Sequence, residues 1–123
     1  MEILIVDDSR TMRMLVRRSL RQAGYGGATV REAENGVKAL EALREHAADL
    51  VLADWNMPLL DGLALLQHLR TDFPQVLVGF VTSQCTAAAR TTAREAGASF
   101  LLAKPFTPEE LRDELLNVAP ECP

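Results

Sequence analysis

Short apolar runs alternate along the chain with longer segments in which apolar residues recur every three or four positions. The runs are rich in Val, Ile, Leu or Phe, and they cover residues 3–7, 28–33, 49–54, 76–82 and 99–103. Three of them are continuously apolar rather than alternating, which is typical of strands covered on both faces. The pattern therefore predicts the central strands of a parallel sheet.

The segments between these runs have the periodicity of amphipathic helices, and some carry capping signals. Residues 9–23 and the alanine-rich residues 84–96 are two of them, and Gly97 is placed to end the latter. Asp61 is a predicted N-cap, and Thr107 begins a capping box with Pro108 and Glu110. The residues predicted to face inward are Met12, Leu15, Val16, Ser19 and Leu20, then Val37, Leu40, Leu43 and Ala47, then Leu63, Leu66 and Leu69, and finally Leu111, Leu115 and Val118.

The order of elements is a strand followed by a helix, repeated along the whole chain. Such a repeat implies right-handed crossovers and a doubly wound α/β fold, with helices on both faces of the sheet. A length of 123 residues suits one domain. We predict a single domain at residues 1–119 and a frayed tail at 120–123.

Composition and charge narrow the classes of function. A formal charge of -4 argues against direct binding to nucleic acid. The sequence has no apolar stretch long enough to cross a bilayer and no signal peptide. Cys85 and Cys122 lie in no metal or redox spacing. We therefore expect a cytoplasmic protein with reduced thiols and no membrane contact, and we expect it to be a monomer.

Polar side chains stand where four of the predicted strands end. These residues are Asp7 and Asp8 after the first strand, Asp54 after the third, Thr82 and Ser83 after the fourth, and Lys104 after the fifth. In a doubly wound sheet, ligands bind at the carboxyl ends of the strands. We therefore expect three carboxylates, a hydroxyl pair and an amine to meet at one edge.

This set of groups suits phosphoryl transfer assisted by a divalent cation. Clustered carboxylates repel one another, and Mg²⁺ or Mn²⁺ would relieve the conflict with oxygen ligands from the three aspartates and the Asn56 backbone carbonyl. Asp54 is the expected nucleophile toward phosphorus, giving an acyl phosphate. Lys104 and Thr82 would then neutralise and hydrogen-bond the phosphoryl oxygens.

The chain resembles the receiver domain of response regulators, most closely the single-domain chemotaxis type. The matching stretches are ILIVDDS, LADWNMPLLDG, FVTSQ and GASFLLAKPF. The resemblance implies a flavodoxin-like sheet of order 2-1-3-4-5, a metal-binding pair at Asp7 and Asp8, and phosphorylation of Asp54. It also implies a switch hydroxyl at Thr82, phosphate sensing by Lys104 and a cis bond before Pro105.

The resemblance further implies the partners and the output of the protein. A phosphohistidine on a histidine kinase or a histidine phosphotransfer protein would be the donor, and phosphorylation would change affinity for a downstream effector protein. No external substrate would be turned over, so the protein would not be an enzyme. Asn56 and Gln84 would tune the lifetime of the phosphoryl group. Neither is a carboxylate, so we expect slow hydrolysis.

One position departs from the family pattern. Many receivers have Tyr or Phe three residues before the lysine, where this chain has Leu101. Leucine has neither a hydroxyl nor a flat ring to turn toward Thr82. We expect the coupling of Thr82 to the surface around the fourth and fifth helices to differ, or signalling to use another surface.

Arginines gather on the first predicted helix, at positions 10, 13, 17, 18 and 21. They form either a solvated face or a docking surface for an acidic helix of the phosphodonor, with Arg13 and Arg17 as the candidate contacts.

Other interpretations are weaker. A flavin binder would need a phosphate loop free of acids where Asp7 and Asp8 stand. A haloacid-dehalogenase-type phosphatase would need an acid two residues after Asp54, where Asn56 stands. A receiver excised from a larger hybrid kinase or regulator remains an alternative to a stand-alone regulator.

Overall fold

Five parallel strands form one sheet in the order β2-β1-β3-β4-β5, as the sequence and the resemblance predicted. The computed structural model describes residues 1–118, so the predicted frayed tail lies outside the described residues, as does Cys122. The strands are β1 (Glu2–Val6), β2 (Thr29–Ala33), β3 (Leu50–Ala53), β4 (Leu77–Thr82) and β5 (Phe100–Ala103).

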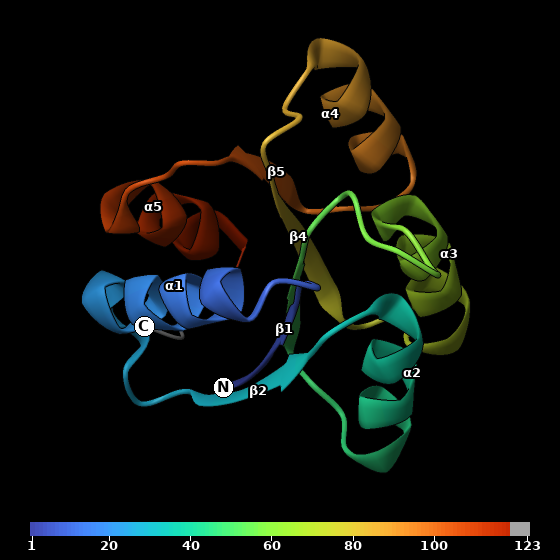
Figure 1. Ribbon diagram of the computed structural model, residues 1–123, viewed down its shortest axis with the longest axis horizontal. Helices are drawn as coiled ribbons and strands as arrows, with labels where there is room; N and C mark the ends of the chain where they lie inside the picture. Colours follow the sequence, from blue (N-terminus) through green and yellow to red (C-terminus); the bar gives the residue numbers. More distant parts are fainter. Residues whose placement is uncertain (119–123) are drawn as a thin grey trace.

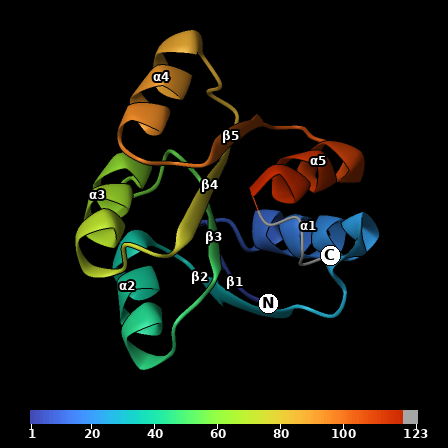
Figure 2. The same ribbon diagram turned by 180° about the vertical axis from the view of Figure 1, so that it is seen from behind.

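Helices cover both faces of the sheet, as Figures 1 and 2 show. On one face lie α1 (Arg10–Leu20) and α5 (Pro108–Val118), and on the other lie α2 (Gly36–Glu45), α3 (Gly62–Asp72) and α4 (Ala87–Glu95). Alternate strand residues supply the two cores: Ile3 and Ile5 pack with α1 and α5, whereas Leu4 and Val6 pack on the opposite side. No helix among residues 1–118 is long and apolar enough to cross a membrane.

The predicted caps at α3 and α5 are confirmed. The Asp61 carboxylate accepts a hydrogen bond from the Ala64 N–H at 2.9 Å. In the capping box, the Thr107 hydroxyl accepts from the Glu110 N–H at 3.1 Å, and the Glu110 carboxylate accepts from the Thr107 N–H at 3.0 Å. These bonds satisfy N–H groups that the helices themselves leave without partners.

Two predicted helix boundaries were wrong. The first helix ends as an α-helix at Leu20 and continues as a π-helical turn, η1 (Arg21–Tyr25), in which Gly24 has a φ of 101°. The fourth helix begins at Ala87 rather than at residue 84, because the Thr86 hydroxyl caps it by accepting from the Ala89 N–H. Gln84 and Cys85 therefore lie in the loop that follows β4.

Three residues predicted to face inward are exposed. The side chain of Leu15 is 47% exposed and that of Val37 is 46% exposed. In α1 the buried residues are Val16 and Leu20, and Leu15 lies about 100° round the helix from Val16. Ala47 lies beyond the end of α2 and is exposed as well. The apolar residues of α1 are spread too widely around the helix for the sheet to cover them all.

The β4–β5 pair contains a close approach that requires glycine. Gly79 is opposite Phe100 in the ladder, and the Phe100 ring lies over the glycine on the side of α1 and α5. A Cβ at position 79 would come within 2.1 Å of the ring. Phe100 is only 7% exposed, so its ring has little room to move away. The ring thus takes the place of a side chain on β4.

Replacing Gly79 with alanine should therefore destabilise the fold by overpacking, by about 1–3 kcal/mol. Gly26→Ala is the matched control, because a Cβ there meets nothing within 4 Å and the backbone φ is -62°. Urea unfolding should give a lower midpoint for Gly79→Ala and an almost unchanged midpoint for Gly26→Ala. Equal midpoints for the two variants would show that Phe100 moves aside at little cost.

Candidate functional site

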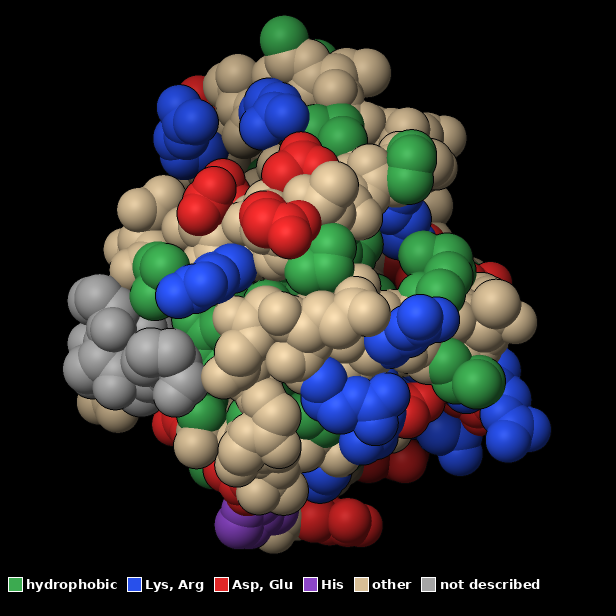
Figure 3. Space-filling model, turned by 90° about the vertical axis from the view of Figure 1, so that its left-hand side faces the viewer, with side chains coloured by type: hydrophobic (Ala, Val, Ile, Leu, Met, Phe, Trp, Pro, Cys, Tyr) green, Lys and Arg blue, Asp and Glu red, His purple; other side chains and the backbone are tan. Residues whose placement is uncertain are grey.

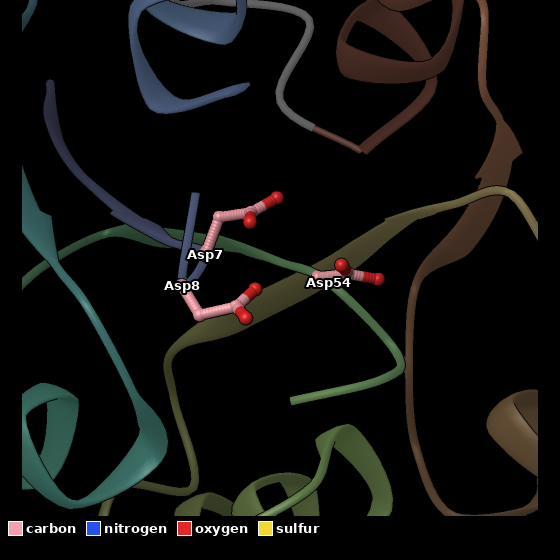
Figure 4. A group of neighbouring side chains, drawn as sticks. All are labelled: Asp7, Asp8 and Asp54. Atoms are coloured by element: carbon pink, nitrogen blue, oxygen red, sulfur yellow. The ribbon is translucent and has the colours of Figure 1, made fainter. Parts of the chain in front are cut away.

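Asp7, Asp8 and Asp54 meet at the carboxyl edge of the sheet, where β1 and β3 end side by side (Figure 4). Ladder hydrogen bonds place them: the Asp7 N–H donates to the Ala33 carbonyl at 3.1 Å, and the Asp54 N–H donates to the Val6 carbonyl at 3.0 Å. One carboxylate oxygen from each aspartate lies within 4.8 Å of the others. The structure thus brings together the three acids that the sequence singled out.

The three aspartates differ in their exposure to solvent. Asp7 is buried and 4% exposed, whereas Asp8 is exposed. The Asp54 side chain lies between these extremes, at 15% exposure. Asp54 is therefore shielded from bulk water but still reachable from the edge of the sheet.

Lys104 supplies the positive charge of the site. Its Nζ lies 3.1 Å from Asp7 Oδ2 and 3.5 Å from Asp54 Oδ2, and its side chain is 14% exposed. The Lys104 N–H donates to the Thr82 carbonyl at 2.8 Å, which ties the residue after β5 to the end of β4. The bond between Lys104 and Pro105 is cis. The ammonium thus offsets part of the repulsion among the carboxylates.

Burial raises the pKa of the Asp54 carboxyl above its ordinary value, and the negative charge of Asp7 acts in the same direction. The Asn56 N–H, which donates to Asp54 Oδ1 at 3.2 Å, and the Lys104 ammonium oppose this rise. The metal-free protein therefore holds the Asp54 carboxylate in a place that disfavours its charge. A cation or a phosphoryl group bound there would change that balance.

The hydroxyl expected at the site belongs to Thr82, which is fully buried at the end of β4. Its Oγ1 accepts a hydrogen bond from the Gln84 N–H at 3.1 Å. Ser83 and Gln84 are exposed in the loop that leads to α4. The hydroxyl proton of Thr82 is therefore available to an acceptor, while the backbone that follows is held by its oxygen.

The loop after Asp54 packs against the start of α3 and against β4. The Gly62 N–H donates to the Trp55 carbonyl at 2.9 Å, and a Cβ at Gly62 would come within 2.9 Å of both the Trp55 backbone and the Phe80 ring. The Trp55 and Phe80 rings meet edge to face at 4.9 Å. The loop that begins after Asp54 is thus supported close to Asn56, which is itself exposed.

Leu101 lies within the core rather than at the surface. It is 6% exposed and packs with the residues beneath α2, α3 and α4. Its backbone carbonyl accepts from Arg90 Nη1 of α4 at 3.2 Å. An arginine on α4 therefore contacts β5 at the position where many receivers carry an aromatic switch residue, and no sequence signal pointed to it.

The two arginines proposed for docking make contacts within the chain. Arg13 Nε pairs with Glu32 Oε1 at 2.9 Å, and Arg17 Nη2 pairs with Glu32 Oε2 at 2.9 Å. Although burial acts in the opposite direction, their hydrogen bonds hold the pKa of Glu32 below its ordinary value. Docking by Arg13 and Arg17 stays a prediction, and both arginines also join α1 to β2.

The remaining arginines of α1 and η1 are exposed. Figure 3 shows the face formed by α1 and α5, with a group of carboxylates in its upper part and cationic side chains both above and below this group. Met14, 58% exposed, lies on the same exposed side of α1. The exposed arginines of α1 and η1 are Arg10, Arg18 and Arg21.

The donor atoms of the acidic cluster fit a hard divalent cation. All three are carboxylate oxygens, which Mg²⁺ and Mn²⁺ prefer, and the described residues offer no thiolate or imidazole in this cluster. The cluster also has more negative charge than Lys104 can balance. Asp7, Asp8 and Asp54 therefore form a cluster that could hold Mg²⁺.

Comparisons with known proteins identify the family of the chain. Residues 3–116 match the family model of the response regulator receiver domain. The chain is 41% identical over 118 residues to the chemotaxis protein CheY1 of Helicobacter pylori, covering 94% of each protein. It is 36% identical to a CheY homolog of Campylobacter jejuni, covering 96% of this chain and 92% of that one.

The fold is also similar to that of a known chemotaxis protein. The structure of the chemotaxis protein CheY4 of Vibrio cholerae superposes with a TM-score of 0.85 at 28% identity, over 95% of this chain and 97% of that one. The family match, the similarity to curated relatives and the shared fold cover almost the same residues. The chain belongs to the response regulator receiver domain family and is similar to its CheY-type members.

Proposed function

We propose that the protein is a phosphoryl-accepting switch of a two-component system, in which Asp54 receives the phosphoryl group. The observation that carries this proposal is the meeting of Asp54 with two further carboxylates and the Lys104 ammonium at one edge of the sheet. Membership of the receiver family supports it. Residues 1–119 would form the single domain that performs this function.

Asp7, Asp8, Asp54 and the Asn56 backbone carbonyl would hold a Mg²⁺ or Mn²⁺ ion. When bound, the ion supplies positive charge that balances the carboxylates and the oxygens of the incoming phosphoryl group. The exposed side chain of Asp8 leaves the cluster open to solvent, from which an ion enters.

In the transfer step, an Asp54 carboxylate oxygen forms a new P–O bond as the P–N bond to the donor imidazole breaks. The electron pair of the P–N bond stays with the imidazole nitrogen. Lys104, already 3.5 Å from Asp54, is placed to pair with a phosphoryl oxygen. The buried Thr82 hydroxyl and the Ser83 hydroxyl would donate to another, which couples phosphorylation to the β4–α4 loop.

The lifetime of the phosphoryl group would depend on the exposed side chains beside the acceptor. Asn56 and Gln84 occupy these positions, and neither can act as a carboxylate base for water. We therefore assign slow hydrolysis and no turnover of an external substrate. The same feature disfavours the alternative phosphatase, which needs an acid where Asn56 stands.

A histidine kinase or histidine phosphotransfer protein would be the donor, and an effector protein would read the phosphorylated form. We propose that the donor docks on the cationic side of α1 that carries Arg13 and Arg17. Further exposed arginines, Arg10 and Arg18 of α1 and Arg21 of η1, lie beside them in a chain with a net charge of -4. An acidic helix would be attracted to them.

Labelling with a small phosphodonor tests the acceptor. Wild type should be labelled in the presence of Mg²⁺ and not after chelation with EDTA, and Asp54→Asn should lose the label because it has no carboxylate nucleophile. Asp113→Asn, on the exposed side of α5, is the matched control and should label like wild type. Undiminished labelling of Asp54→Asn would place the acceptor elsewhere.

Charge reversal tests the docking surface. Arg18→Glu with Arg21→Glu should slow phosphoryl transfer from a protein donor about tenfold or more, since steering by opposite charge changes the association rate. Labelling by a small phosphodonor should be unchanged. Arg44→Glu with Arg94→Glu, on the other face of the sheet, is the control pair. Equal slowing by both pairs would point to net charge instead of a docking surface.

The raised pKa of Asp54 predicts a pH-dependent stability of the metal-free protein. Because ionisation is easier in the unfolded chain, Asp54 costs stability above its folded pKa, and this cost disappears as pH falls through the folded pKa and then the ordinary value of 3.8. In EDTA, Asp54→Asn should therefore unfold at a higher urea midpoint than wild type at neutral pH.

The gain from Asp54→Asn should shrink as the pH is lowered toward 3.8. Asp113→Asn should show no such pH-dependent difference from wild type. A gain that grows in acid would mean that the folded protein favours the charged form of Asp54.

A further inference from the structure

Arg13 touches the backbone of the acidic pair, a contact that phosphoryl transfer itself does not explain. Its Nη1 donates to the backbone carbonyl of Asp7 at 2.6 Å, while its Nε is held by Glu32 at 2.9 Å. The Arg13 side chain is 15% exposed, compared with 38% for Arg17. Arg13 is therefore partly buried and links α1 to the end of β1 and to the edge strand β2.

We propose that Arg13 is a positioning residue of the cation site: by fixing the Asp7 carbonyl, it sets the direction in which Asp8 presents its carboxylate. This inference rests on the proposed function, because it assumes that the acidic cluster binds Mg²⁺. Arg13 does not touch the ion. It acts through the backbone between the two aspartates.

The covalent geometry of the chain carries the argument. The Asp7 carbonyl and the Asp8 N–H belong to one planar peptide unit, so a hydrogen bond that fixes the carbonyl also fixes the position of the Asp8 Cα. Asp7 is held at two further points, since its N–H donates to Ala33 and its Oδ1 accepts from the Ser9 N–H at 2.9 Å. The Asp8 side chain is exposed, so its direction depends on this backbone.

Glu32 explains how the positively charged guanidinium of Arg13 can lie beside a cation-binding site. The Arg13 guanidinium would repel Mg²⁺ if its charge were unopposed, but Glu32 lies 2.9 Å from its Nε. Arg17 shares Glu32 and donates to the Val30 carbonyl at 3.2 Å, without reaching Asp7. The pair thus separates two roles: both arginines brace α1 on β2, and Arg13 also fixes the acidic pair.

A titration with Mg²⁺ distinguishes positioning from charge. Trp55 is the single tryptophan and follows Asp54, so its fluorescence is the readout, on the full chain without phosphodonor. Positioning predicts that Arg13→Gln and Arg13→Lys both raise the Kd for Mg²⁺, by about tenfold, as loss of an outer-shell partner does. A pure charge effect predicts tighter binding for Arg13→Gln and wild-type binding for Arg13→Lys.

Two further variants separate stability from position. Arg31→Gln removes an arginine that also donates to backbone carbonyls, those of Ala42 and His46, at the far end of α2. It should lower the urea midpoint of the metal-free protein and leave the Kd for Mg²⁺ unchanged. Arg17→Gln, which loses Glu32 but no contact with Asp7, should raise the Kd by less than Arg13→Gln.

The outcomes separate the two proposals. If wild type shows no saturable response to Mg²⁺, the metal site of the proposed function fails and the role of Arg13 fails with it. If wild type binds Mg²⁺ and either Arg13 variant binds as tightly, only the role of Arg13 is overturned. If Arg13→Gln does not fold, Arg13→Lys decides, since it keeps the charge and loses the two-pronged contact.

Discussion

Repulsion among Asp7, Asp8 and Asp54 is the constraint around which the rest of the site is arranged. Parallel strands end at one edge, so the fold that builds the site also forces three negative charges together. Lys104 offsets part of this charge, and a divalent cation would balance the remainder. Burial, and to a smaller extent the negative charge of Asp7, raises the pKa of Asp54 above its ordinary value.

The residues around the aspartates hold them against that repulsion. The Ser9 and Asn56 N–H groups each donate to a site carboxylate, at 2.9 Å and 3.2 Å. Packing of Gly62 beneath Trp55 supports the loop that carries Asn56. The residues of the site that follow β1 and β3 are therefore held in place by hydrogen bonds and packing. On the β4 side, residues 83–85 precede the Thr86 cap and form no regular structure, and the Gln84 N–H donates to the Thr82 hydroxyl oxygen.

Strand ends could be predicted from the sequence because they depend on local hydrophobic runs and on one rule of topology. Asp54 and Lys104 follow such runs directly, and their meeting follows from the parallel sheet. The contacts of Arg13 and Arg90 could not be predicted, because each depends on where a long side chain ends after α1 or α4 has packed. Leu15 was placed wrongly for a related reason: helical periodicity does not tell which of two adjacent apolar residues the sheet covers.

Lys104 and Asp7 are 97 positions apart in the sequence, yet their charged groups lie 3.1 Å apart. Such a pair forms only when the first and last strands occupy the same sheet, with β3 and β4 already between them. A chain that has folded its first half carries the acidic pair but not the lysine that partners it. The complete charged site, which the proposed phosphoryl transfer would need, is thus a property of the completed fold, because Lys104 reaches Asp7 only once the last strand is in place.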